Sequence, residues 1–191
     1  LATGSLLVFS DDDIIPRADW LKQYKAGADR YPNHDIFGGQ ILPHFPDGAR
    51  LDPKIPFDHQ FTKSAYALTF WEPIEGPVSP NRIWGPNMAV RKKVFEQGIS
   101  FNPEIGPNGR NYVMGSETEF ITRAHREGFQ IIYLPGVVVQ HQLREEQLSL
   151  SWLKGRAYRT GRARAKVYRE FDKFNKVFGV PNFVWRKVVQ S

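Results

Sequence analysis

Residues 6–16 read LLVFSDDDIIP: an apolar run that predicts a buried strand leads into three consecutive aspartates and, shortly after them, a proline. A turn or a helix start would explain one aspartate at this place, but not three carboxylates that repel one another. Carboxylates at the carboxyl end of a strand lie where open α/β sheets bind their ligands. Asp11 and Asp13 can therefore share a hard divalent cation such as Mg²⁺ or Mn²⁺ through oxygen ligands.

Strands and helices alternate along the rest of the chain, which predicts an α/β fold. Strands are expected over residues 5–10, 35–43, 129–135 and 136–141, and a short strand that runs into a helix is expected within 87–98. Further helices are expected over 17–31 and 116–128, and a basic helix or helix pair over 149–171, interrupted at Gly155 and Gly161.

Three local patterns refine this expectation. The pair Gly38-Gly39 inside a strand predicts a bulge or a close backbone approach. Ser116 followed three residues later by Glu119 predicts a capping box at the start of a helix. Residues 43–84 are rich in proline, aromatic residues and aspartate without a clear period, which is typical of a long functional loop.

The composition fits one packed domain or part of a larger one. The 191 residues are 41% hydrophobic and 14% aromatic, and no apolar run approaches the roughly 18 residues of a membrane-spanning helix. The lack of cysteine excludes disulfides and zinc–thiolate sites and fits a reducing compartment. Because the chain opens almost directly on a strand and without a methionine, we expect it to be a fragment.

The positive charge is concentrated at the C-terminal end. Residues 144–191 hold 12 lysines and arginines against 4 acidic residues, whereas residues 1–143 hold 14 basic and 16 acidic residues. The stretch KGRAYRTGRARAKVYR, residues 154–169, is either a solvated helix face or a surface that meets an anion. The anion could be a diphosphate, an anionic lipid surface or a nucleic acid.

Two further residues are candidates for chemistry. Glu117 lies in the expected first turn of a helix, where a carboxylate either compensates the helix dipole or serves as a general base. His141 ends the apolar run VVVQH, where a histidine is either structural or a ligand for a metal whose carboxylates come from elsewhere. Neither residue is decisive alone.

Taken in order, these segments resemble the family-two glycosyltransferases of the GT-A fold. The resemblance spans roughly residues 2–161 and rests on four segments: VFSDDDIIPRADWL for the D-x-D strand, GPNMAVRKKVF, GSETEFITR and IIYLPGVVVQH. It implies a GT-A-like, Rossmann-related mixed sheet flanked by helices. In that fold the N-terminal nucleotide-binding strands would precede residue 1. Residues 1–143 would form a partial catalytic domain and residues 144–191 a basic helical extension.

The resemblance also implies roles for single residues. Asp13 would bind the metal, Asp11 would contact the nucleotide or the metal, and His141 would touch the metal or the diphosphate. Glu117 falls on the position of the catalytic base, although Ser116 stands where the family has a second acidic residue. The implied substrate-binding residues are Asp11, Asp12, Trp84, Gly85 and Asn87, with Arg156 and Arg159 placed over the diphosphate.

The activity implied is that of a metal-dependent inverting glycosyltransferase of the hexosyltransferase type. Mg²⁺ or Mn²⁺ is the implied cofactor, a nucleotide-diphosphate sugar the donor and a saccharide or other hydroxyl compound the acceptor. The product would belong to a polysaccharide or glycoconjugate. No nucleic-acid partner is expected; the location would be cytoplasmic, with peripheral membrane contact through residues 152–187. The isolated segment need not be active alone.

Two alternatives remain open at the level of the sequence. A haloacid-dehalogenase-type phosphatase would use Asp11 as nucleophile and Asp13 as acid/base. That pattern wants threonine or valine where Ile15 stands and a later pair of acidic metal ligands, which GSETEF matches poorly. The other alternative is a non-enzymatic basic module that binds nucleic acid or an anionic membrane through residues 152–187.

Overall fold

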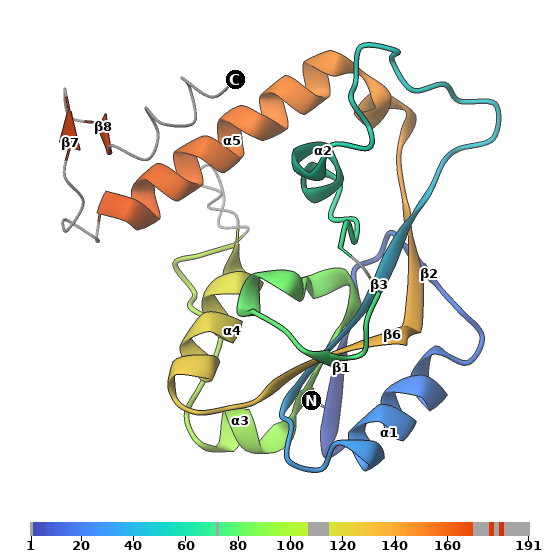
Figure 1. The fold of residues 1–191 in the computed structure, drawn as a ribbon. Helices are drawn as coiled ribbons and strands as arrows, with labels where there is room; N and C mark the ends of the chain where they lie inside the picture. Colours follow the sequence, from blue (N-terminus) through green and yellow to red (C-terminus); the bar gives the residue numbers. More distant parts are fainter. Residues whose placement is uncertain (1, 72, 107–114, 170–175, 178–179, 182–191) are drawn as a thin grey trace.

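The computed structural model describes residues 2–71, 73–106, 115–169, 176–177 and 180–181, with side chains up to residue 161 (Figure 1). Its centre is a six-stranded mixed sheet with the order β1-β5-β3-β6-β2, and β4 pairs with β6. The strands are β1 (Leu6–Phe9), β2 (Ile14–Pro16), β3 (Ile36–His44), β4 (Gly76–Pro77), β5 (Met88–Arg91) and β6 (Ile131–Gln142). Only the pair β3–β6 is parallel among these neighbours.

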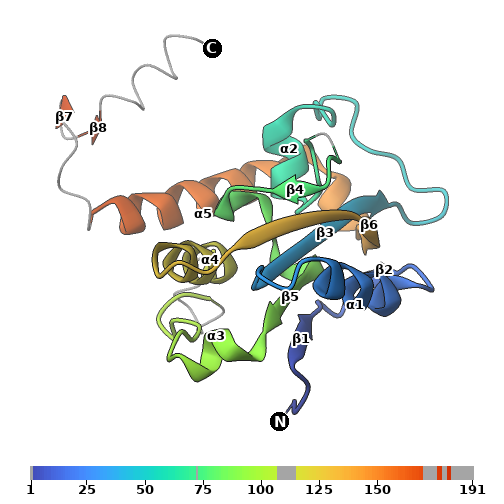
Figure 2. The same ribbon diagram turned by 60° about the horizontal axis from the view of Figure 1, so that its bottom comes forward.

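Helices cover both faces of this sheet (Figure 2). The α-helices are α1 (Trp20–Arg30), α2 (Gln60–Ala65), α3 (Lys92–Glu96), α4 (Ser116–Arg126) and α5 (Leu150–Arg169). Short 3₁₀ turns, η1 (Pro80–Arg82), η2 (Gly85–Asn87) and η4 (Glu145–Leu148), link them, and β7 (Lys176–Val177) pairs with β8 (Val180–Pro181). The predicted mixed sheet flanked by helices is thus confirmed.

Successive side chains of a strand point to opposite faces of the sheet, so neighbouring strand residues pack against different helices. Ile36, Met88 and Val90 pack in one core cluster with Phe120 and Ile121 of α4. Their strand neighbours pack in a second cluster with residues of α1, namely Phe37, Ala89 and Ile132 with Tyr24 and Ala28. The sheet therefore separates α1 from α3 and α4.

A third core cluster lies at the other end of β3 and β6 and brings in the C-terminal part of the chain. It joins Ile41 and Val139 of the sheet to Tyr66 and Leu148, with Trp152 of α5 packed against it. Residues on either side of position 143, the boundary expected from the charge distribution, share this one cluster. The functional loop expected over residues 43–84 contains α2, and it supplies Tyr66 to this end of the sheet.

Several expectations are corrected by the structure. Residues 131–142 form one long strand, and its partner register jumps from Gly39↔Leu134 to Gln40↔Val138, so the extra residues lie on β6. α5 runs through Gly155 and Gly161 without interruption. The expected capping box is wrong, because the N-cap is Gly115 with a left-handed backbone.

The close backbone approach expected at the glycine pair is confirmed. A Cβ added at Gly38 would meet the Ile83 side chain, and one at Gly39 would meet Asn87 and the carbonyl of Val137.

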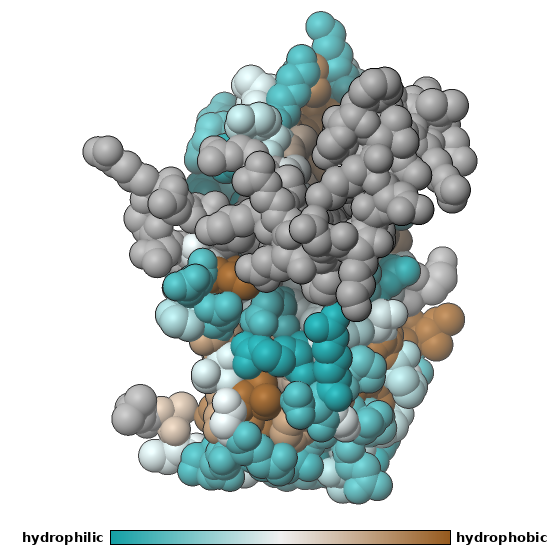
Figure 3. All heavy atoms as spheres, turned by 90° about the vertical axis from the view of Figure 1, so that its left-hand side faces the viewer, coloured by the Kyte–Doolittle hydropathy of each residue, from teal (hydrophilic) through white to brown (hydrophobic). Residues whose placement is uncertain are grey.

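The face in Figure 3 is dominated by hydrophilic residues over its described part, with hydrophobic residues in small separate groups. Within the described residues, no helix combines the length and apolarity that crossing a bilayer requires.

Candidate active site

A pocket of about 160 Å³ lies where β1 ends, and it gathers residues from widely separated segments. The predicted residues Asp11, Asp13, His141 and Arg156 all line it. The remaining lining residues are Ala65 at the end of α2, Tyr66 and Ala67 after it, Pro86 of η2, Arg144, Gln147 of η4 and Trp152 of α5. Most of the metal and diphosphate candidates that the sequence suggested therefore share one cavity.

The short strand β2, which the sequence did not predict, is what places Asp13 beside His141. Ile14 pairs with His141 in antiparallel register, and the backbone N–H of Gln142 donates to the carbonyl oxygen of Asp13 over 2.8 Å. The side chains follow: Asp13 Oδ2 lies 3.4 Å from His141 Nε2. Strand pairing thus joins two residues that are far apart in the sequence.

The orientation of His141 follows from its other ring nitrogen. Nδ1 lies 2.7 Å from the carbonyl oxygen of Tyr66. Because a carbonyl oxygen only accepts hydrogen bonds, Nδ1 carries the proton. In the neutral ring the lone pair is then on Nε2, the nitrogen that faces Asp13.

Carboxylates crowd around Asp11. Although the residue as a whole is exposed, partial burial of its carboxyl raises the pKa above its ordinary value. The negative charges of Asp13, Glu117 and, to a smaller degree, Asp12 raise this pKa further, whereas His141 lowers it. Clustered carboxylates of this kind favour a cation, which would relieve their mutual repulsion.

The residues fit a hard divalent cation with few protein ligands. Adjacent ligands of an ion with bonds of about 2.1 Å lie ~3 Å apart, close to the separation of Asp13 Oδ2 and His141 Nε2. In the described part of the chain, no group of three or more acidic, histidine or cysteine side chains has metal-binding geometry. Mg²⁺ is commonly held by one or two carboxylates together with substrate phosphates and water, which matches this donor set.

Glu117 lies outside the pocket lining, where its side chain packs against Gly85. Glu117 is half-buried in the first turn of α4, and its charge acts on the carboxyl of Asp11. A Cβ placed at Gly85 would lie only 2.9 Å from Cγ and Oε1 of Glu117. The predicted residue Gly85 therefore makes room for the predicted base, and its own contact is with a protein carboxylate.

Asn87, expected to bind substrate, lies in the core of the protein. Its side chain is fully buried: Oδ1 accepts from Trp20 Nε1 and from the Tyr24 hydroxyl, both at 2.8 Å. Nδ2 donates to the carbonyls of Gln40 and Val137 at 2.9 and 3.0 Å. All four hydrogen-bonding positions of the amide are used, which argues against a direct sugar contact.

The other predicted substrate contacts lie outside the pocket lining. Trp84 donates its indole N–H to the carbonyl of Asn81 over 3.2 Å and packs edge-to-face with Trp71. Asp12 and Arg159 are exposed, whereas Arg156 lines the pocket and donates from Nε to the carbonyl of Ala65 over 3.2 Å. Of the two predicted arginines, only Arg156 therefore lies at the carboxylates.

Sequence reasoning missed part of the lining. Arg144, which pairs with Glu146 at 3.3 Å, lines the pocket as a second cationic group, and Trp152 stacks on Tyr66 with ring centroids 4.9 Å apart. Tyr66 was visible only as one of several aromatic residues in a long loop. Nothing local marks Arg144 or Trp152, because their function depends on how η4 and α5 pack against the sheet.

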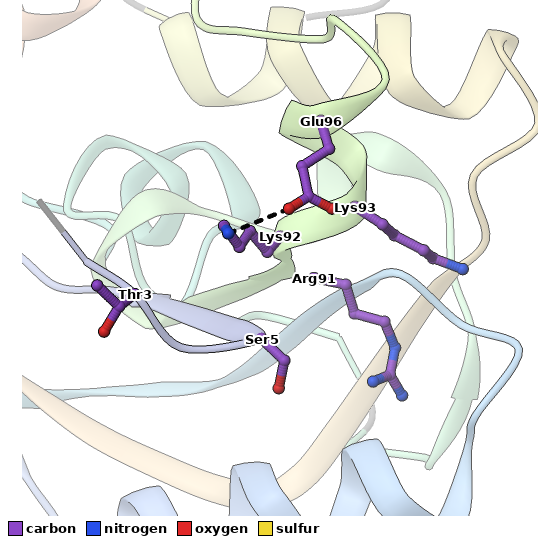
Figure 4. A pocket seen from close by; sticks show the side chains of 6 residues that line it. All are labelled: Thr3, Ser5, Arg91, Lys92, Lys93 and Glu96. Carbon is purple, nitrogen blue, oxygen red and sulfur yellow. Dashed lines mark ion pairs between the residues drawn. The ribbon is translucent and has the colours of Figure 1, made fainter.

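A larger hollow of about 440 Å³ lies at the opposite end of β1, lined by Thr3, Ser5, Arg91, Lys92, Lys93 and Glu96 (Figure 4). Its cationic groups are already engaged. Lys92 pairs with Glu96 at 3.1 Å, and Lys93 pairs with the buried Asp35 at 2.6 Å. Arg91 donates to the carbonyls of His34 and Ala28. We therefore place the chemistry in the smaller pocket, where the carboxylates meet.

Comparisons with known proteins give one curated relative and several structural likenesses. No family model matches the chain. The chain is 25% identical over 170 residues to the succinoglycan biosynthesis protein ExoM of Rhizobium meliloti (strain 1021), a match that covers 88% of this chain. The chain spans only 50% of that relative's length.

Two solved structures are similar to parts of the chain. One is S. aureus TarS 1-349, with 17% identity, a TM-score of 0.46 and coverage of 74% of this chain and 36% of that one. The other is GalNAc-T7 with UDP, GalNAc and Mn²⁺, with 18% identity, a TM-score of 0.47 and coverage of 75% and 28%.

Proposed function

We propose that this chain is part of the catalytic domain of a GT-A-like glycosyltransferase that transfers a sugar from a nucleotide-diphosphate donor to an acceptor hydroxyl. The observation that carries the proposal is the meeting of Asp11, Asp13 and His141 in one pocket. The chain resembles family-two glycosyltransferases in four ordered segments, and it is similar to a succinoglycan biosynthesis protein. That similarity supports a role in polysaccharide synthesis.

In this proposal the cationic residues of the pocket bind the diphosphate of the donor, and the carboxylates and the histidine bind the metal. Arg156 and Arg144 line the same pocket as the aspartates and would bind diphosphate oxygens through charge-assisted hydrogen bonds. Asp13 and His141, with Asp11 beside them, would hold Mg²⁺ or Mn²⁺. A bound divalent ion supplies Lewis-acid stabilisation of the charge that develops on a leaving diphosphate.

Glu117 would act on the acceptor. A carboxylate that takes the proton of the attacking hydroxyl in the transition state increases the rate by ~10²–10⁴-fold. Attack from the side opposite the diphosphate would invert the anomeric configuration, so the proposed enzyme is inverting. Glu117 lies outside the pocket lining, but its charge acts on the carboxyl of Asp11 and its half-buried side chain lies against Gly85, which supports this role.

The phosphatase alternative receives less support. It needs a second acidic metal ligand near Glu117, and Glu119 is the nearest carboxylate along α4. Both oxygens of Glu119 are engaged by Arg123, at 2.9 and 3.0 Å. The glycosyltransferase hypothesis is therefore better supported than the phosphatase hypothesis.

Glu117→Gln in the complete protein is expected to lower kcat by ~10²–10⁴-fold with little change in the KM for the donor, because the amide cannot accept the proton. Gly85→Ala should also lower kcat, since the added methyl group would displace the Glu117 carboxylate. Steady-state kinetics with a nucleotide-sugar donor measure both.

Glu119→Gln is the matched control for this pair, because Glu119 lies in the same helix and contacts Arg123. Its kcat should stay within about twofold of the wild-type value, a change of less than ~0.5 kcal/mol in the barrier. A Glu117→Gln enzyme with wild-type kcat would remove Glu117 from the mechanism.

We also propose that α5 provides peripheral membrane contact. The helix holds seven lysines and arginines and no acidic residue, and Lys154, Tyr158 and Arg159 are exposed on its described part. Basic helices with aromatic side chains bind anionic lipid surfaces at about 1 kcal/mol per charge. Residues 170–191 add four lysines and arginines and two acidic residues. The side chains from residue 162 onward lie outside the described part.

Vesicle flotation tests this contact. The complete protein should float with vesicles that contain anionic phosphatidylglycerol and remain behind with phosphatidylcholine alone, and Lys154→Glu together with Arg159→Glu should weaken the binding at least tenfold. Equal binding to both kinds of vesicle, or binding to nucleic acid in place of anionic vesicles, would contradict the proposal.

A further inference from the structure

We infer that Ala67 is a positioning residue for His141: its left-handed backbone holds the carbonyl of Tyr66 against His141 Nδ1 and so directs Nε2 toward Asp13. The inference concerns the geometry of the chain, and its meaning for metal binding rests on the function proposed above. Ala67 lines the pocket but would not touch the ion; it would act through the histidine.

The backbone of Ala67 is unusual. Its φ is 54°, and among the described residues no other non-glycine has a positive φ. A Cβ makes this conformation unfavourable, so surrounding contacts must hold it. Residues kept in such regions cluster at functional sites, and this one is at the rim of the carboxylate pocket.

Two hydrogen bonds at the end of α2 hold the turn. The N–H of Leu68 donates to the carbonyl of Lys63 over 2.8 Å, and the N–H of Ala67 donates to the carbonyl of Ser64 over 3.1 Å. This is the Schellman arrangement, in which the left-handed position is usually glycine. Beyond it, the N–H of Thr69 donates to the carbonyl of Ile41, which returns the chain to the sheet.

Tyr66, the residue before the turn, is fixed on its other side. Its ring is 1% exposed and stacks on Trp152, and its hydroxyl donates to the carbonyl of Gln147 over 2.7 Å. The peptide between Tyr66 and Ala67 is therefore held from both ends, and its carbonyl lies 2.7 Å from His141 Nδ1. If Ala67 moved to a negative φ, the two turn hydrogen bonds and this carbonyl direction could not all persist.

The hydrogen bond to the Tyr66 carbonyl fixes which ring nitrogen of His141 carries the proton. Metal-binding histidines commonly donate their second N–H to a backbone carbonyl, which fixes the ring and leaves the other nitrogen as the ligand. Here the carbonyl is that of Tyr66, and the freed Nε2 lies 3.4 Å from Asp13 Oδ2. Loss of such a partner typically weakens metal binding by 10–100-fold.

Nitrogen-15 NMR of the metal-free complete protein tests the positioning directly. The His141 signals, assigned by comparison with His141→Ala, should show an Nδ1–H that is hydrogen-bonded to a backbone carbonyl. A wild-type protein in which Nδ1 of His141 carries no proton would overturn the inference without any further variant.

Two substitutions at position 67 form a matched pair. Ala67→Gly suits a positive φ and should keep the Nδ1–H signature, with an Mn²⁺ affinity within about twofold of wild type. Ala67→Val, whose β-branched side chain disfavours this conformation, should lose the signature and bind Mn²⁺ about 10–100-fold more weakly. In a His141→Ala background, Ala67→Val should have no further effect on Mn²⁺ affinity.

Ala67→Val with a lower melting temperature but an unchanged His141 signature would show that Ala67 merely ends α2, and would overturn the inference. If Ala67→Val does not fold, the wild-type signature and the Ala67→Gly result still decide. A wild-type protein with the expected tautomer but no Mn²⁺ binding would instead contradict the proposed metal site and leave the positioning intact.

Discussion

Asn87→Ala is expected to reduce the free energy of unfolding of the complete protein by about 3–5 kcal/mol. The amide of Asn87 makes four hydrogen bonds to three elements, since it accepts from Trp20 and Tyr24 of α1 and donates to Gln40 of β3 and Val137 of β6. Its removal would leave buried donors and acceptors unpaired, each at a cost of about 1–3 kcal/mol. Denaturant-induced unfolding measures the change.

A second variant separates shape from hydrogen bonding. Asn87→Asp keeps the size of the side chain but replaces the amide group, which donates to Gln40 and Val137, by a carboxylate oxygen. It should therefore destabilise the protein by a similar amount, about 3–5 kcal/mol.

Asn81→Ala is the control, because Asn81 is exposed in the same segment and accepts from the Trp84 indole through its backbone carbonyl. The control should stay within about 0.5 kcal/mol of wild type. If Asn87→Ala cost no more than the control, Asn87 would not be the structural hub described above.

Much of the fold follows from local patterns in the sequence. The apolar run before the aspartates became β1, and the pattern of NMAVRKKVFEQG became β5 and α3. The helix after Pro16 and the strand with the glycine pair became α1 and β3, with small shifts of their ends. Hydrophobic periodicity is strong in these segments, so tertiary packing had little to override.

The misses have tertiary causes. β2 has only three residues, and it forms because Ile14–Pro16 pair with the long strand β6, so no local signal announces it. The first turn of α5 is held by tertiary packing, because Leu153 lies in a core cluster with Ile55 and Ala65 of the preceding loop and helix. The described residues give no comparable contact at Gly161, through which the helix also continues. Glu119, expected in a capping box, instead pairs with Arg123 one turn later.

In the candidate site, too, some residues have a local sequence signal and others are placed only by tertiary packing. Sequence motifs identified Asp11, Asp13, His141 and Glu117 as the candidates for the proposed chemistry. They could not show that Asn87 is saturated with hydrogen bonds or that Gly85 serves Glu117, because both facts depend on packing between distant segments. The assignment of Arg144 needed the position of η4.

Asp13→Ala is expected to reduce nucleotide-sugar turnover by the complete protein by ~10³-fold, because stabilisation of a leaving diphosphate by a bound ion is worth several kcal/mol. The substitution removes the carboxylate that faces His141 Nε2 at 3.4 Å. Asp29→Ala is the matched control, since Asp29 is an exposed residue of α1 whose carboxylate pairs with Lys25. The control should keep wild-type turnover.

Metal restoration tests the central claim most directly. The complete protein, the Asp13→Ala variant and the Asp29→Ala control are stripped with a chelator, and Mn²⁺ is then titrated while turnover of the nucleotide-sugar donor is measured. We predict that Mn²⁺ restores the wild type and the control, whereas Asp13→Ala stays ~10³-fold lower at every concentration. Full turnover without the metal, or full restoration of the Asp13→Ala variant, would contradict a metal-dependent glycosyltransferase site at Asp13.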